Sequence, residues 1–248
     1  MLKIALLIPS TSKNRNWKSF KESYLYKHTL KTLLLTYDAE HEYKVYVAID
    51  RGDPVYDSIE SKEGFIRFVS VMKNIKIGFY YNDNIPKGHV TKMWNMLFGI
   101  AHEENSDYFY QCGDDIEFKT KGWVNDSVKA LKSSGNLGLT GPINNNSRIL
   151  TQSFVSRRHM DLFGYYFPEE IINWFCDDWI NEVYVGLKKF YPLVNHYCAN
   201  VGGDPRYNIN NVKHLSEEEF SISINKMRKK CSNLSARDIT RARLKIIE

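Results

Sequence analysis

Two adjacent carboxylates, Asp114 and Asp115, follow the aromatic segment 107–113, and Glu117 lies two positions further on. Two like charges about 4 Å apart repel by roughly 4 kcal/mol at the effective dielectric of a protein surface. Mg²⁺ and Mn²⁺ relieve such repulsion, because they bind one or two carboxylates and complete their coordination with water and phosphate oxygens. We therefore expect Mn²⁺ or Mg²⁺ and a phosphate-bearing ligand here. The alternative is that the acids cap the helix that follows.

A second acidic pair, Asp177 and Asp178, interrupts an aromatic stretch between Trp174–Phe175 and Trp179. Partial burial among aromatic rings raises the pKa of a carboxyl group, which suits a general base. Aspartate is also a favoured first residue of a helix, and the residues alone leave both interpretations open.

Three further residues have side chains suited to a metal or nucleotide site. His196, near the end of segment 190–198, is either a metal ligand or a structural histidine. Lys92 and Asn95, in segment 89–104, are suited to a phosphate or a nucleotide base, or they lie on a solvated helix surface.

These residues follow a regular alternation of predicted strands and helices. The predicted strands cover residues 2–10, 43–50, 75–81 and 107–112. The predicted helices between them cover residues 19–37, 61–72 and 89–104. This order predicts an α/β fold with a mostly parallel central sheet flanked by helices. Ligands bind at the carboxyl ends of such strands, so we expect Ser10, Asp50, Asn82 or Asp83, and the Asp114–Asp115 pair to converge.

The second half of the chain ends in a basic segment. Its predicted elements are a helix over 121–134, a strand or turn over 137–143, a helix over 169–189 with an interruption near Cys176, and a strand over 190–198. Ser216 and Glu219 form a capping-box pattern at the start of a further helix rich in Lys and Arg. We therefore divide the chain into a catalytic domain, 1–207, and a basic helical C-terminal extension, 208–248.

Composition narrows the class of protein. The chain has 248 residues, 43% of them hydrophobic, and a net charge of +5, which permits an anionic small-molecule substrate but does not indicate nucleic acid. Its four cysteines form no CxxC pair, which argues against a zinc cage. The apolar N-terminal run is too short for a signal peptide, and no apolar run is long enough to span a membrane. We therefore expect a cytoplasmic protein. Weak peripheral membrane contact would use its basic tail.

The order of these motifs resembles that of the GT-A fold glycosyltransferases, particularly their family-2-like branch, over residues 1–207. "ALLIPSTS" resembles the first nucleotide-binding strand and loop, and "KGHVTKMWNMLFGIA" the helix before the central strand. "YFYQCGDDIEF" resembles that strand with its DxD-type motif, and "LTGPI" the strand that follows it. "SRRHMDLFGYYFPEE…CDDW" resembles the acceptor segment, and "VNHY…GGDPRY" the late metal-binding histidine with its loop.

The resemblance implies the GT-A (nucleotide-diphospho-sugar transferase) fold and roles for individual residues. The nucleotide-sugar would bind to Pro9, Ser10, Thr11, Asp50, Lys92, Asn95 and Asp114. The metal would bind to Asp115, His196 and Glu117, although the Asp-x-Asp pattern is here Gly113-Asp114-Asp115 with an Asp-x-Glu register. Asp178, or Asp177, would deprotonate a hydroxyl of a glycan or other acceptor, and the sugar of a UDP-sugar would be transferred with inversion.

Other functions fit the residues less well. A sugar-nucleotide pyrophosphorylase resembles a pattern with a glycine-rich basic loop after the first strand, and "PSTSKNRNW" contains no glycine. The "GDD" of viral RNA polymerases lies in a hairpin, whereas the context here is strand-then-helix and the chain is too short for a polymerase. A non-enzymatic phosphate, nucleic-acid or membrane binder would use the basic tail, and the alternative is a solvated helix packed on the domain.

Overall fold

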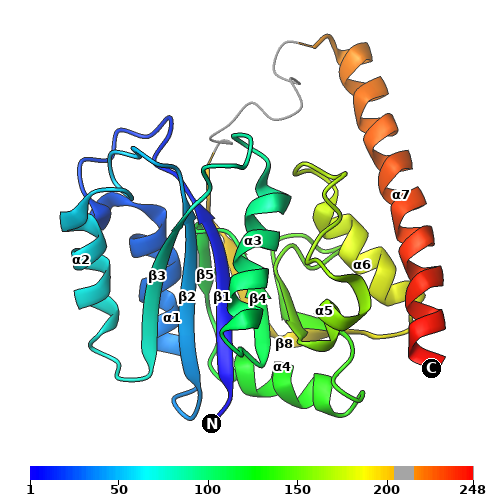
Figure 1. Cartoon of the computed structure of the whole chain (residues 1–248), viewed down its shortest axis with the longest axis horizontal. Coiled ribbons are helices and arrows are strands. Elements are labelled where there is room, and N and C mark those ends of the chain that lie inside the picture. Colours follow the sequence, from blue (N-terminus) through cyan, green and yellow to red (C-terminus); the bar gives the residue numbers. More distant parts are fainter. Residues whose placement is uncertain (204–214, 248) are drawn as a thin grey trace.

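The computed structural model describes residues 1–203 and 215–247 (Figure 1). Its strands are β1 (Lys3–Ser10), β2 (Glu42–Ile49), β3 (Ile75–Tyr81), β4 (Tyr108–Gln111), β5 (Ile116–Phe118), β6 (Leu139–Ile143), β7 (Ser153–Ser156) and β8 (Phe190–Asn200). Its helices are η1 (Phe20–Glu22), the π-helical η2 (Leu25–Leu30), α1 (Lys31–Thr36), α2 (Ile59–Val69), α3 (Val90–Glu103), α4 (Trp123–Lys132), α5 (Arg158–Phe163), α6 (Cys176–Gly186) and α7 (Glu217–Ile247).

One sheet with the strand order β3-β2-β1-β4-β7-β6-β8-β5 runs through the molecule. β1 pairs in parallel with both β2 and β4, and β2 pairs in parallel with β3. β7 is antiparallel to β4 and to β6, while β8 is parallel to β6 and antiparallel to β5. The predicted α/β fold with a mostly parallel sheet flanked by helices is confirmed, and the antiparallel pairs make the sheet mixed.

Two hydrophobic cores cover the two faces of this sheet. Successive side chains of a strand point to opposite faces, and in β1 Ile4 and Leu6 join the core that contains α1, α2 and α4, whereas Ala5 and Leu7 join the core that contains α3, α6 and α7. Burial on both faces explains why β1 reads as a continuous apolar run rather than an alternating one.

The segment before α6 differs from the prediction. A helix was expected over 169–189 with an interruption near Cys176. The helix α6 begins at Cys176, where the interruption was expected, and Phe175 before it has a left-handed backbone with a φ of +73°. The hydroxyl of Thr91 in α3 donates to the carbonyl of Ile171 at 2.5 Å. Tertiary contacts therefore hold residues 169–175 as a loop, and the prediction was wrong for this half of the segment. The strands β5 and β7 and the helix α5 were not predicted.

The 31-residue helix α7 lies along α6, and its N-terminal turns extend beyond the rest of the molecule (Figure 1). The capping box predicted at its start is present, since Ser216 and Glu219 exchange hydrogen bonds. Cys231, Leu234 and Ala242 of α7 are buried in the core shared with α6. These contacts support a helix packed on the domain. The boundary at residue 207 stays a prediction, because 208–214 lie outside the described residues.

No helix within residues 1–203 and 215–247 combines the length and apolar content needed to cross a membrane.

Asp238 anchors α7, because its buried carboxylate accepts hydrogen bonds from the Tyr165 hydroxyl at 3.0 Å and the Trp179 indole at 3.2 Å and pairs with Arg237 at 2.8 Å. Asp238→Ala leaves these donors without their acceptor, and a buried donor left unsatisfied costs about 1–3 kcal/mol of unfolding free energy. Chemical denaturation measures this loss.

Asp238→Asn keeps one acceptor oxygen and is expected to lose less stability than Asp238→Ala. Glu218→Ala, at an exposed position of the same helix, serves as the control and should change the unfolding free energy by less than about 0.5 kcal/mol. A loss below about 1 kcal/mol for Asp238→Ala would contradict the anchoring role.

Candidate functional site

The parallel strands β1 to β4 end at the same edge of the sheet, beside a cavity of about 450 Å³. The residues at the end of each strand or directly after it line this cavity: Pro9 and Ser10 at the end of β1 and Thr11 after it, Asp50 after β2, Asn82 after β3, and Gly113, Asp114 and Asp115 after β4. The expected convergence of strand-end residues is therefore present in the structure. A volume of this size is in the range of small-molecule sites.

One buried carboxylate fixes the loops after β1 and β2. Asp53 accepts hydrogen bonds from the backbone N–H of Ser12 at 2.8 Å, the Ser12 hydroxyl at 2.7 Å and the Thr11 hydroxyl at 3.1 Å. It also accepts from the N–H groups of Val55 at 3.0 Å and Tyr56 at 2.9 Å. Asp53 was not among the candidate residues predicted from the sequence. The signal present was an Asp followed by Pro, a pattern that favours side-chain-to-backbone hydrogen bonds in turns.

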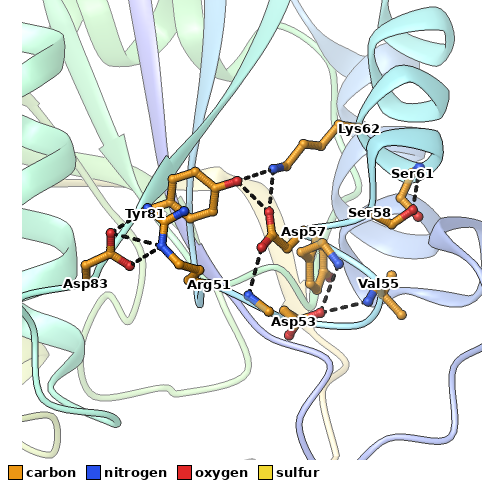
Figure 2. Close-up of polar contacts among 11 residues, drawn as sticks. Arg51, Asp53, Val55, Asp57, Ser58, Ser61, Lys62, Tyr81 and Asp83 are labelled. Atoms are coloured by element: carbon orange, nitrogen blue, oxygen red, sulfur yellow. Dashed lines mark hydrogen bonds and ion pairs between the residues drawn. The ribbon is translucent and has the colours of Figure 1, made fainter.

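A second network of hydrogen bonds and ion pairs holds the loop after β2 in place (Figure 2). Arg51 pairs with Asp83 at 2.6 Å, and its guanidinium lies 4.0 Å from the centre of the Tyr81 ring. Asp57 accepts from Lys62 at 2.7 Å and from the Tyr81 hydroxyl at 2.5 Å, which hold the pKa of that carboxyl well below its usual value. The loop that carries Asp50 is thus tied both to β3 and to α2.

The acidic pair after β4 lies at the wall of the cavity. Asp114 is fully buried, and its carboxylate accepts from the Tyr56 hydroxyl at 3.3 Å. The backbone of Asp115 accepts from the N–H of Val201 at 2.9 Å. Gly202 lies so close to the Asp115 carboxylate that an added Cβ would overlap its Oδ2 atom. The loop that follows β8 therefore covers Asp115. Residues 204–207 of the predicted "GGDPRY" loop lie outside the described residues.

Glu117 and His196 do not join this pair. Glu117 lies 2.7 Å from Nδ1 of His28 and forms an ion pair with Lys119. His196 lies between the Thr120 hydroxyl at 3.0 Å and the Asp126 carboxylate at 2.8 Å, and neither Glu117 nor His196 lines the cavity.

The course of β8 explains the placement of His196. The strand continues four residues past His196, about 13 Å, and ends at Asn200, which lines the cavity. The structure thus does not bring Asp115, His196 and Glu117 together. Within residues 1–203 and 215–247, no three His, Cys, Asp or Glu side chains are grouped to hold one metal ion. Asp114 and Asp115 still fit a hard cation, because Mg²⁺ takes one or two carboxylates and fills its shell with water and phosphate oxygens.

Lys92 and Asn95 also lie outside the cavity lining. Met93, between them in sequence, lines the cavity, and helical geometry turns its neighbours to other directions. Lys92 pairs with Glu169 at 3.2 Å. Asn95 donates to the carbonyl of Phe167 at 2.8 Å and accepts from its N–H at 2.9 Å. The predicted nucleotide-binding role is not apparent from these contacts, which instead hold the segment after α5 against α3.

The two acids at the start of α6 have different surroundings. Asp177 lines the cavity, and burial together with the charge of Asp178 raises its pKa to about 6. Asp178 pairs with Arg148 at 2.7 Å and does not line the cavity. A carboxyl that changes its protonation near neutral pH and faces a cavity is suited to accept a proton.

Several other cavity residues were not predicted. Trp94 lies in α3, Gln111 ends β4, and Gln152 precedes β7, while Trp174 had been considered only as a neighbour of the acidic pair. Gln111 lies in the predicted strand 107–112 that leads into the acidic pair, which was the one available signal. The others come from loops or helix faces whose orientation the sequence pattern does not fix.

Comparison with known proteins finds similarity in structure alone: no family model and no curated protein matches the sequence. The structure is similar to that of TarS from S. aureus, with a TM-score of 0.54, 12% identity, and coverage of 92% of this chain and 43% of that one. It is also similar to TarS 1–349 in complex with UDP-GlcNAc, with a TM-score of 0.55, 14% identity, and coverage of 92% and 65%.

TarS 1–349 in complex with UDP is similar to the same degree, with a TM-score of 0.53 at 14% identity over 91% of this chain and 64% of that one. The chain spans less than two thirds of the length of each of these structures. The similarity shows that this chain and TarS share a fold.

The raised pKa of Asp177 makes stability depend on pH. The folded carboxyl binds its proton more tightly than the unfolded one, so wild-type stability falls as pH rises from about 4 through 6. Asp177→Asn removes this ionisation. We expect the variant to match wild type near pH 4 and to be more stable at pH 8, by up to about 3 kcal/mol.

Thermal or chemical unfolding at pH 4 and pH 8 measures the difference. Glu218→Gln on α7, at an exposed position, should show the same difference from wild type at both pH values. An Asp177→Asn effect that is equally large at both pH values would show that ionisation is not its cause.

Proposed function

We propose that the chain is a metal-dependent glycosyltransferase that moves a sugar from a nucleotide-diphosphate-sugar, a UDP-sugar, to an acceptor hydroxyl. The observation that carries this proposal is one cavity lined both by the Asp114–Asp115 pair and by Asp177, whose pKa lies near neutral. The fold shared with TarS, which was crystallised with UDP-GlcNAc and with UDP, supports the choice of donor. The GT-A resemblance of the motif order supports the same assignment.

The strand-end side of the cavity is suited to the nucleotide. The Asp50 carboxylate lies 3.3 Å from the Thr11 hydroxyl, whose single proton it shares with Asp53, and it offers oxygens to the N–H of a base or to ribose hydroxyls. Pro9 and Ser10 line the same side, and the Ser10 hydroxyl oxygen is buried with no hydrogen-bond partner among the described residues. Arg15 adds a guanidinium to the lining, and a positive charge there favours a bound diphosphate.

Asp115, with Asp114 beside it, would hold the cation. A bound Mn²⁺ or Mg²⁺ would supply positive charge that stabilises the departing nucleoside diphosphate. The surroundings of Glu117 and His196 favour a site completed by substrate oxygens over the three-residue ligand set expected from the sequence.

Asp177 is the better of the two candidate bases. Its carboxylate takes the proton of the acceptor hydroxyl as the hydroxyl oxygen attacks the anomeric carbon. The bond from that carbon to the diphosphate oxygen breaks, and its electron pair leaves with the diphosphate. This single displacement inverts the anomeric centre. Asp178, held by Arg148, keeps a negative charge beside Asp177 that favours its protonated form.

Asp115→Asn tests the metal site, because the amide removes a charged oxygen ligand. We expect UDP release from UDP-GlcNAc in the presence of Mn²⁺ to fall by about 100-fold or more, with an unchanged melting temperature. Glu117→Gln is the matched control, since Glu117 lies outside the cavity lining. Equal losses in the two variants would argue against a special role for Asp115.

A second pair of variants separates the two acids of α6. Asp177→Asn removes the base and should lower the turnover number by about 10²–10⁴-fold. Asp178→Asn keeps the base but lowers its pKa by removing a neighbouring charge, so the acid limb of the pH–rate profile, near pH 6 in the wild type, should move to lower pH. The assignment is wrong if Asp178→Asn causes the larger loss and leaves the profile in place.

A further inference from the structure

Part of the cavity lining has no role in the proposed donor site. It includes Asp177 and four residues that do not follow a parallel strand: Thr151, Gln152, Asn173 and Trp174. A transferase needs a place for its acceptor next to the base. These four residues are therefore the candidates for acceptor recognition.

Trp174 contributes an aromatic side chain to the cavity lining. Its side chain is half-buried, and its ring meets Phe220 of α7 in an edge-on contact, with centroids 6.2 Å apart and planes at 83°. Such a contact covers only part of an indole, and the indole also lines the cavity. The negative face of an aromatic ring attracts weakly positive C–H groups, and the C–H face of a pyranose ring is such a surface.

Gln152 adds a buried hydrogen-bond acceptor. Its side chain is 2% exposed, and its Oε1 atom has no hydrogen-bond partner among the described residues. A buried acceptor of this kind is stabilised by an incoming hydroxyl group. None of these four residues is a Lys or Arg, and Arg15 of the same lining is assigned to the donor diphosphate, which favours an acceptor without a phosphate group.

The loop that carries Trp174 is held from two sides. α3 fixes it through the hydrogen bond from Thr91 to Ile171. α7 fixes it through Lys230, which donates to the carbonyl of Glu170 at 2.5 Å, and through Cys231, whose thiol donates to the carbonyl of Phe175 at 3.5 Å. A recognition residue that is positioned before binding loses less entropy when it binds.

We propose that the acceptor is a carbohydrate whose ring stacks on Trp174, with a hydroxyl bonded to Gln152 and the reacting hydroxyl at Asp177. This inference rests on the proposed function. An alkyl chain would use the indole but leave Gln152 without a partner, whereas a sugar ring satisfies both groups. The α7 helix thereby acquires a role in the site, because it supports the aromatic platform.

Transfer assays on the full chain test the proposal. UDP-GlcNAc, UDP-glucose and UDP-galactose serve as donors with Mn²⁺, and p-nitrophenyl glycosides of glucose, galactose, mannose and N-acetylglucosamine serve as acceptors, with glycerol as a non-cyclic polyol. We expect at least one glycoside to increase UDP release above hydrolysis more than glycerol does. Trp174→Ala should then raise the acceptor KM by about tenfold or more, with donor hydrolysis and UDP affinity within twofold of wild type.

Two further variants separate recognition from structure. Trp174→Phe keeps an aromatic face and should recover part of the acceptor KM. Ile172→Ala alters an exposed residue of the same loop that does not line the cavity, and it should leave the acceptor KM unchanged.

The proposal is overturned if no glycoside exceeds glycerol, or if Trp174→Ala leaves the acceptor KM within twofold while UDP binding and donor hydrolysis persist. Absence of UDP binding by calorimetry would instead overturn the proposed function, so the two failures are distinguishable.

Discussion

The candidate site depends on the carboxylate of Asp53. A charge taken out of water is costly unless hydrogen bonds replace its hydration, and Asp53 obtains them from the loops that follow β1 and β2. Neither loop can move without leaving a buried charge without its donors. Because Tyr56, held by Asp53, donates to Asp114, the constraint extends to the end of β4. Three strand ends are thus joined through one side chain that contacts no substrate in the proposed mechanism.

The second constraint is the entry into α6. Phe175 has a left-handed backbone, and the helix begins directly after it with Cys176 and the acidic pair. Neighbouring acids on a helix point in different directions, so Asp177 faces the cavity while Asp178 reaches Arg148. Two identical residues thereby acquire different electrostatic surroundings, which is the arrangement that separates acid–base roles in many enzymes.

The sequence predicted the parallel half of the sheet well, because central parallel strands are continuous apolar runs with polar residues at their carboxyl ends. It therefore also predicted that Ser10, Asp50 and the Asp114–Asp115 pair would lie at one cavity. It could not predict the antiparallel pairing of β5 with β8, which carries Glu117 toward His28 and places His196 beside Asp126. The GT-A resemblance assigned Glu117 and His196 as metal ligands from the order of the motifs. That order does not determine which residues of two paired strands lie opposite each other.

Two further differences between the predictions and the structure also arise from contacts between residues far apart in the sequence. Asn95 was a reasonable candidate for a nucleotide contact, but its amide satisfies the backbone of a loop 72 residues away. Residues 169–175 have apolar spacing compatible with a helix, yet hydrogen bonds from α3 and α7 hold them in a loop. Long-range hydrogen bonds that decide such cases leave no local pattern in the sequence.

The contact between Gly202 and Asp115 has a consequence for related sequences. The Asp115 carboxylate occupies the space that a side chain at position 202 would need, so a residue other than glycine there requires this carboxylate to move while the backbone keeps this course. A relative with a larger residue at 202 must shorten or displace the acid at 115, or reroute the loop after β8. Gly203, where an added Cβ would lie 3.5 Å from its nearest neighbour, carries no such restriction. In related sequences, a residue other than glycine at position 202 should therefore accompany a substitution at position 115, whereas substitutions at position 203 should occur independently of position 115.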